Sequence, residues 1–298
     1  MTSPAQFIAV GYDGLRITSP DGKTWSEEVL GKEGMTFNAL AIGGGRCLTA
    51  GIHGGRNIFS VTDDGQNWQD SDSDAGYSRY SRGVFFARDR FYILAGDPVT
   101  VGNAKVEIFT TKDGSKIESH AQQEKALSVL RRCAVGEDLF VAVGDRGRRA
   151  WSEDAITWHD DENSKPLETL IDIAYGNGVF VGVGLHGLRM TSDDGKTWGS
   201  QLVGEEGEHL NRILWTGDRF VAVGLGATYF SPDGHNWTRE PNIDPPLTAA
   251  FGNGVFVGSN WKGRLMSSSD AIRWEQVHRC SQHVEAVEFG ELSGTAAG

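Results

Sequence analysis

A short motif that recurs seven times constrains the fold of this 298-residue chain more than any other feature. The motif begins with Ser or Thr, followed by any residue and then Asp. Gly or Ala comes next, and after two further residues the motif ends with Trp, as in TSDDGKTW at 191–198. Successive motif aspartates are 43, 49, 41, 40, 39 and 37 residues apart. This period is typical of a propeller blade of four strands, which takes about 40 to 45 residues. The aligned aspartates are Asp21, Asp64, Asp113, Asp154, Asp194, Asp233 and Asp270.

The remainder of each unit has the pattern of β-strands. Asn177-Gly178 and Asn253-Gly254 are typical of tight hairpin turns, because both positions favour positive φ. The run VFVGV at 179–183 is apolar on both faces, so both faces of that strand must be covered, as in stacked blades. The pattern predicts one all-β domain over residues 1–298, a seven-bladed β-propeller of four-stranded antiparallel blades.

The first unit lacks an innermost strand, because the chain begins with the apolar run of a second strand, FIAVG at 7–11. The segment HVEAVEFGEL, from His283 to Leu292, has the pattern of the missing strand. We therefore predict that the C-terminal strand completes the first blade. This arrangement closes the ring and pairs sheet edges that would otherwise promote aggregation.

The motif resembles that of the Asp-box (bacterial neuraminidase repeat) β-propeller superfamily, in the variant [ST]-x-D-[GA]-x-x-W. The resemblance covers almost the whole chain and supports the predicted fold. It leaves the function open, because the superfamily implies sialidases, other glycan hydrolases and lyases, photosystem assembly factors and receptor ectodomains. A sialidase would carry an F/Y-R-I-P motif and usually six blades, whereas this chain has LRITSP around Arg16 and seven units.

We interpret the motif as structural. Its Asp is expected to accept backbone N–H groups in the turn between the third and fourth strands, and its Trp to insert between blades. A catalytic group is needed once, whereas this Asp occurs seven times. Unit three has Ile117 in place of Trp, and units four and seven have Ala155 and Ala271 in place of Gly. We expect looser packing in those blades.

Composition excludes some classes of function. A net charge of −12 argues against a broad nucleic-acid interface, which needs clustered positive charge. No apolar run is long enough to span a bilayer and the N-terminus lacks a signal-peptide pattern, so we expect a cytoplasmic protein with no membrane partner. Cys47, Cys133 and Cys280 are widely spaced, which predicts reduced thiols and no disulfide framework. We expect no cofactor and no metal.

Binding residues are expected on the face opposite the motifs. There the turns between second and third strands lie beside the links that lead to the next innermost strand, and binding sites favour such concave mouths. Arginines that face this mouth could hold a carboxylate, sulfate or phosphate. Alternatively, they pair with acidic loops and join the blades. The candidates are Arg16, Arg56, Arg82, Arg132, Arg149, Arg189, Arg212 and Arg264.

Other candidates are aromatic residues and histidines. Tyr80, beside Arg82, and Trp261, outside the motif register, are candidates for stacking on a sugar or an aromatic ring, although either could simply pack against a loop. His53 and His186 occupy the same turn position in units two and five, and imidazole is a suitable metal ligand; because these units lie across the ring, we favour hydrogen-bonded turn histidines over a metal site. The acidic segment from Asp70 to Gly76 has calcium-like spacing but lacks the downstream Glu of an EF-hand, so we interpret it as a solvated loop.

The function that we favour at this stage is recognition of a glycan or a small anionic or aromatic ligand at the central mouth. One alternative is a carbohydrate-active or other acid-base enzyme, and another is a scaffold for protein assembly. The sequence leaves open the identity of the ligand, whether any reaction is catalysed, and the oligomeric state. Candidate acid-base residues for the enzyme alternative are Tyr80, Asp172, His53, His186 and Glu285.

Overall fold

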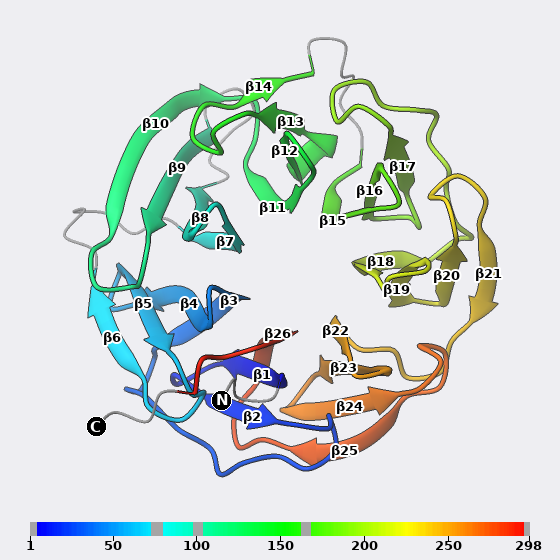
Figure 1. Cartoon of the computed structure of the whole chain (residues 1–298). Coiled ribbons are helices and arrows are strands. Elements are labelled where there is room, and N and C mark those ends of the chain that lie inside the picture. Colours follow the sequence, from blue (N-terminus) through cyan, green and yellow to red (C-terminus); the bar gives the residue numbers. More distant parts are fainter. Residues whose placement is uncertain (1–4, 73–79, 98–103, 162–167, 295–298) are drawn as a thin grey trace.

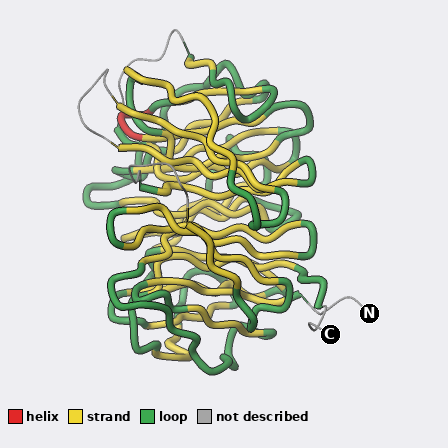
Figure 2. Tube along the Cα trace, turned by 90° about the vertical axis from the view of Figure 1, so that its left-hand side faces the viewer, coloured by secondary structure: helices red, strands yellow, loops and turns green. Residues whose placement is uncertain are grey.

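The computed structural model describes residues 5–72, 80–97, 104–161 and 168–294, which form seven antiparallel sheets arranged in a ring (Figure 1). Each sheet is one blade, and its innermost strand faces the axis of the ring. Viewed edge-on, the strands run across the thickness of the ring and the turns gather at its two faces (Figure 2). The predicted seven-bladed propeller is therefore confirmed. The innermost strands are β3 (Thr36–Gly43), β7 (Ser81–Ala87), β11 (Leu130–Val135), β15 (Leu170–Gly176), β18 (His209–Trp215), β22 (Thr248–Gly252) and β26 (Val284–Gly290).

The other strands follow outward in each blade. The second strands are β1 (Gln6–Gly11), β4 (Arg46–His53), β8 (Arg90–Asp97), β12 (Phe140–Gly144), β16 (Val179–Gly184), β19 (Phe220–Leu225) and β23 (Val255–Asn260). The third strands are β2 (Arg16–Ser19), β5 (Arg56–Thr62), β9 (Ala104–Thr111), β13 (Arg149–Ser152), β17 (Arg189–Ser192), β20 (Ala227–Ser231) and β24 (Arg264–Ser268). The outermost strands are β6 (Gln69–Asp72), β10 (Glu118–Ala126), β14 (His159–Asp160), β21 (Thr238–Pro241) and β25 (Glu275–Arg279).

The outermost segment is reduced in two blades. In the first and fifth blades it joins the third strand through a single bridge, Arg16 with Val29 and Arg189 with Leu202. A 3-10 turn, η1 (Asp145–Gly147), lies between β12 and β13. Within the described part of the chain, no helix is long and apolar enough to cross a bilayer.

The C-terminal strand completes the first blade, as the sequence predicts. Strand β26 pairs antiparallel with β1, for example Phe7 with Phe289 and Val10 with Ala286. The first blade is thus built from both ends of the chain, and β1 and β26 lie side by side in Figure 1.

The hydrophobic core is divided into clusters between neighbouring blades. Phenylalanines at the start of second strands, such as Phe140 and Phe220, are almost completely buried in these clusters. The expected loosening around Ala155 and Ala271 is not observed. Both alanines are fully buried with left-handed φ values of 63° and 61°, and the tryptophans of the same motifs, Trp158 and Trp274, are buried. The side-chain methyl group of Ala155 or Ala271 therefore fits between the blades without disturbing the packing of the motif Trp.

The innermost strands share a backbone feature that sequence analysis missed. Six of them, among the described residues, contain a β-bulge near the end at which the strand begins. In five of these six strands a glycine of the second strand lies opposite the bulge and makes room for it: a Cβ on Gly184, for example, would lie 2.0 Å from the Thr169 carbonyl oxygen. A bulge leaves its extra residue unpaired. The residues skipped by the pairing are Asn38, Arg82, Arg131, Ile171, Asn211 and Glu285.

Candidate functional site

The repeated motifs form a set of closed turns on one face of the ring, which we call the motif face. In the fifth blade, the Asp194 carboxylate accepts the Lys196 and Thr197 N–H groups at 2.8 and 2.6 Å and also the Ser192 hydroxyl. Equivalent bonds from the Thr24 and Lys23 N–H groups lower the pKa of Asp21 to about 2. Each motif carboxylate thus accepts N–H groups of its own turn, which supports a structural role for the motif.

The opposite face, the mouth face, carries the turns between second and third strands. Three predicted ligand-binding arginines begin third strands below this face, but their side chains are buried between blades. Arg16 donates to the Gly14 carbonyl at 3.0 Å and pairs with Asp70 at 3.0 Å. Arg189 lies with its guanidinium 3.8 Å from the centre of the Tyr229 ring. These contacts join adjacent blades, which is the alternative that the sequence left open.

Arg149 has the same place in the fourth blade. Its guanidinium donates to the Gly147 carbonyl at 3.1 Å and pairs with Asp161 at 3.2 Å. Asp70, the first residue of the acidic segment, is held by Arg16 and by the Ser60 hydroxyl at 2.6 Å. Most of that segment lies outside the described residues, so the interpretation of residues 73–76 as a solvated loop stays a prediction.

A central channel of about 130 Å³ runs between the innermost strands and contains four charged side chains: Arg132, Asp172, Arg212 and Glu288. Arg212 pairs with Glu288 and lies 3.6 Å from Asp172. Asp172 is buried and also accepts the Ile213 N–H at 2.9 Å. Arg132 donates to the carbonyls of Arg82 and Arg131. The charges of the four side chains balance, so the channel network is internally neutral.

Burial and neighbouring charges act in opposite directions in this network. Burial raises the pKa of Glu288, against the attraction of Arg212. Burial also lowers the pKa of Arg132, with a further contribution from Arg212 nearby. For Arg212 the attraction of Glu288 and Asp172 outweighs burial and raises its pKa. Asp172 and Glu288 thus share one guanidinium, an arrangement suited to holding the innermost strands together.

An arginine cluster formed by Tyr80, Arg82, Arg131 and Arg132 lies at the mouth end of the third and fourth blades. The Arg82 guanidinium stands 5.4 Å from the centre of the Tyr80 ring, which is half exposed, and donates to the Gly96 carbonyl at 3.2 Å. Burial and the nearby Arg131 lower the pKa of Arg82. Arg131 pairs with Asp145. The structure therefore brings Tyr80, Arg82 and Arg132 together, while Asp145 and Asp97 offset part of the positive charge of the cluster.

Across the channel, a second hollow crosses the mouth face of blades five to seven. This rim groove has a volume of about 690 Å³. Its apolar lining comes from turns and links: Leu185, Leu225, Pro245, Pro246, Leu247 and Trp261. Leu225 is 55% exposed and Trp261 64% exposed, so the groove presents apolar side chains to solvent. Asn242 adds a buried carbonyl oxygen, Oδ1, without a hydrogen-bond partner among the described residues.

Trp261 is held in place at the seventh blade. Its ring stacks on His283 at 5.1 Å with an interplanar angle of 12°, and His283 meets the edge of Tyr12 at 5.3 Å. The backbone N–H of Trp261 donates to Asn260 Oδ1 at 2.7 Å. Stacking on one face leaves the indole pre-oriented for contact through its remaining exposed surface.

The remaining predicted site residues are dispersed around the mouth face. Arg264 pairs with Asp244 at the edge of the rim groove. Glu285 lies 3.6 Å from His283 and raises the pKa of Tyr12 through its charge. His186 lies beside His209, a groove residue, with ring centres 5.3 Å apart. His53 and Arg56 face each other at the turn of the second blade and do not join either cluster.

Glu288 and the lining of the rim groove other than Trp261 were not predicted from the sequence. Glu288 lies within β26 with no motif around it, and only its pairing with Arg212 reveals its role. The rim groove arises from the link NIDPPL at 242–247, where two prolines and exposed Ile243 interrupt the regular pattern. In the sequence, the two adjacent prolines beside Ile243 and Leu247 were the feature that could have indicated this groove.

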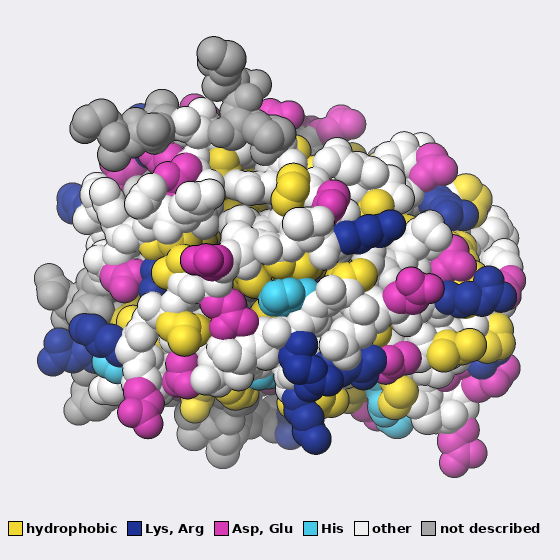
Figure 3. Space-filling model, turned by 90° about the horizontal axis from the view of Figure 1, so that it is seen from below, with side chains coloured by type: hydrophobic (Ala, Val, Ile, Leu, Met, Phe, Trp, Pro, Cys, Tyr) yellow, Lys and Arg dark blue, Asp and Glu magenta, His cyan; other side chains and the backbone are white. Residues whose placement is uncertain are grey.

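On the side of the ring drawn in Figure 3, acidic, basic and apolar side chains are interspersed over most of the outer wall, and several Lys and Arg side chains lie together below the centre of the view.

Comparisons with known proteins support the fold. No protein-family model and no curated protein sequence matches the chain. A solved structure described as "YCF48 bound to D1 peptide" is similar to it, with a TM-score of 0.60 and 21% sequence identity over 80% of this chain and 77% of that chain. At this level of identity the likeness shows a shared propeller fold.

Proposed function

We propose that this protein binds an extended segment of a partner protein on its mouth face. The observation that carries the proposal is the rim groove, where Trp261 and Leu225 are more than half exposed beside a volume of about 690 Å³. Exposed apolar side chains that line a concave surface mark interaction sites, and a rigid Trp is a common anchor of binding energy.

The form of the groove favours a peptide over a compact ligand. Its lining combines the apolar side chains of Leu225 and Trp261 with the amide side chains of Asn211 and Asn260. An extended backbone presents N–H and C=O groups that amides can bind, and its alternate side chains can contact apolar surface. The similar solved structure is described as bound to a peptide, which supports the same use of this fold.

The arginine cluster adds a preference for charge. Strands β7 and β11, which carry the cluster, lie across the channel from β18 and β22, which border the rim groove (Figure 1). A segment that places apolar residues in the groove and an acidic residue or a C-terminal carboxylate near Arg82 would complement both regions.

Recognition of a glycan or a small anionic or aromatic ligand is the second candidate. It is supported by the pairing of exposed Tyr80 with Arg82 and Arg132 at the channel mouth. Membership of the Asp-box superfamily and a cytoplasmic location also stay proposals; the first is supported by the shared geometry of the seven turns. The enzyme alternative is less supported, because Asp172 is engaged by the Ile213 N–H and lies beside Arg212.

A peptide-display experiment tests the proposal. Peptides selected from a random library on the wild-type protein should share apolar and acidic residues, and Trp261→Ala should weaken their binding by at least about 30-fold, as for other anchor residues. Binding is measured by fluorescence anisotropy with labelled selected peptides. Val203→Ala is the matched control, because Val203 is 65% exposed but lies outside the groove lining.

The outcomes separate the candidates. Unchanged binding by Trp261→Ala, or no enrichment of peptides, would overturn the peptide proposal. Retention of an oligosaccharide on a glycan array, lost in Arg82→Ala and kept in Trp261→Ala, would establish the second candidate instead.

A further inference from the structure

Three side chains with metal-binding atoms meet where the first and seventh blades adjoin at the outside of the ring. They are Glu28, His278 and Cys280, and one ligand atom from each lies within 4.8 Å of the other two. His278 belongs to β25, the outermost strand of the seventh blade, and Cys280 follows that strand. Glu28 precedes Val29, the residue that bridges to the third strand of the first blade. We call this group the seam cluster.

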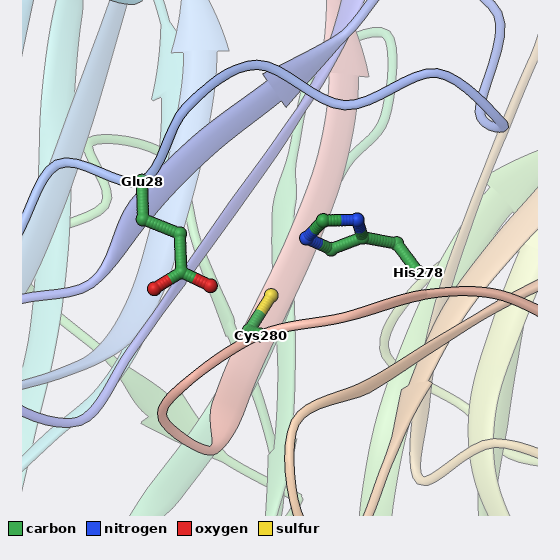
Figure 4. Close-up of side chains that lie close together, drawn as sticks. All are labelled: Glu28, His278 and Cys280. Atoms are coloured by element: carbon green, nitrogen blue, oxygen red, sulfur yellow. The ribbon is translucent and has the colours of Figure 1, made fainter.

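The side chains of the seam cluster point toward one another. In Figure 4 the His278 ring is directed at the Cys280 sulfur, and the Glu28 carboxylate approaches the same sulfur from the other side. The Nε2 atom of His278 is buried and has no hydrogen-bond partner among the described residues. A buried nitrogen without a partner is unfavourable, so its direction toward two further donors requires an explanation.

A neighbouring serine fixes the carboxylate. The Ser281 N–H donates to one oxygen of Glu28 at 2.8 Å, and the Ser281 hydroxyl donates to the other. Each carboxylate oxygen retains a lone pair for another partner. Hydrogen bonds of this kind orient carboxylates that bind metals in many proteins.

We propose that the seam cluster is a binding site for a divalent metal ion of the zinc class. Thiolate, imidazole and carboxylate together form a donor set that suits Zn²⁺, and three protein ligands leave one position of a tetrahedron for water. On binding, the Cys280 thiol loses its proton to solvent and the sulfur bonds to the metal. The metal also supplies the partner that His278 Nε2 lacks.

A metal ion bound at the seam cluster would connect the first blade to the seventh. Glu28 comes from the first blade, while His278 and Cys280 come from the seventh, so a bound ion links two blades that are distant in sequence. The ion binds the folded ring and not the separated strands, so it stabilises the closed state by mass action. Stability should therefore increase with the concentration of free Zn²⁺.

Cobalt provides a direct measurement. Chelator-treated protein titrated with Co²⁺ should develop a sulfur-to-cobalt charge-transfer band that saturates at one ion per chain, and Zn²⁺ should abolish the band and raise Tm. Cys280→Ser and His278→Gln should each remove the saturable band or greatly reduce the affinity. Ser281→Ala should weaken affinity by about 10- to 100-fold, because it acts only by orienting Glu28.

A second cysteine, Cys133, provides the matched control for the cobalt titration. Cys133→Ser should keep the band, since Cys133 is half-buried elsewhere in the ring and donates to the Ala134 carbonyl at 3.4 Å. Absence of the band in wild-type protein that is folded by circular dichroism would overturn the proposal. Persistence of the band in folded His278→Gln with unchanged affinity, or its loss in Cys133→Ser alone, would do the same.

Discussion

The two faces of the ring differ in what the blades have in common. On the motif face, the same side chains repeat in every blade: an Asp that accepts N–H groups of its own turn and, in six of seven units, a Trp. On the mouth face, what recurs is a feature of the backbone, a bulge in the innermost strand, while the residue at the bulge ranges from Asn38 and Arg82 to Ile171 and Glu285.

This difference shows how one repeated unit can keep its turns constant on one face while its side chains vary on the other. A contact made in every blade can be lost once with limited effect, because each copy acts within its own turn. A variable side chain on a fixed bulge alters the surface without altering the blade. The arginine cluster and the rim groove both border bulge positions, namely Arg82, Arg131 and Asn211. Contacts that occur once should therefore show larger effects when broken than contacts that recur.

The largest effect is expected for Arg212→Ala in the channel network. The substitution leaves Asp172 and Glu288 without their shared guanidinium, which should reduce the free energy of unfolding by about 3 to 5 kcal/mol. Urea denaturation measures it. Arg264→Ala is the control, since its pair with Asp244 lies at the surface and should contribute about 1 kcal/mol or less. Equal losses in the two variants would contradict a special role for the channel network.

Gly184→Ala is expected to come next. The added Cβ would lie 2.0 Å from the Thr169 carbonyl oxygen, so the bulge must shift and stability should fall by about 3 kcal/mol. The matched control is Gly178→Ala, where the new methyl meets no atom within 4 Å and only the positive φ of 81° is unfavourable, by about 1 kcal/mol. Thermal and urea unfolding of both variants compare a steric clash with conformational strain alone.

Asp194→Ala should have a smaller effect, on the order of 1 to 2 kcal/mol, because it removes the acceptor of two backbone N–H groups in one of seven equivalent turns. Urea denaturation at neutral pH checks this value. A reduction in the free energy of unfolding as large as that of Arg212→Ala would contradict the view that each recurring contact contributes only a small part of the stability. No loss at all would show that the motif does not stabilise the turn.

The smallest expected effect is a change in the pH dependence of stability when Asp21 is replaced by Asn. The pKa of Asp21 is about 2 in the folded protein, below the value of about 3.9 for an unfolded chain, so its contribution is complete above about pH 4 and disappears as the pH falls toward 2. Asp21→Asn should therefore lose less stability than wild type between about pH 4 and pH 2. Urea midpoints over that range measure the difference, and parallel pH profiles would contradict the assignment.

The repetition explains which parts of the fold could be predicted from the sequence. Seven motifs at a steady period predicted seven blades, and the missing first strand predicted the role of residues 284–290, because both follow from counting units. The bulges could have been predicted too. The glycines that oppose five of them lie at or near the ends of second strands, at Gly11, Gly51, Gly144, Gly184 and Gly224, a pattern already visible in the sequence.

The candidate sites were harder to predict, because they depend on contacts between blades that carry no shared pattern. Arg16, Arg149 and Arg189 occupy a register that faces the neighbouring blade, and only the packing shows that their guanidinium groups are buried. Arg212 and Glu288 are 76 residues apart and meet because both strands face one axis. Similarly, Glu28 reaches Ser281 across 253 residues.

The pairing of β1 with β26 has a consequence for the order of events during synthesis. Blades two to seven are assembled from consecutive residues, so each can form soon after it leaves the ribosome. The first blade must wait for residues 284–290, and until then the edge of β1 stays open to other chains. The ring is therefore completed only at the end of synthesis, and the period before that step is the one in which the open edge is most exposed to misassembly.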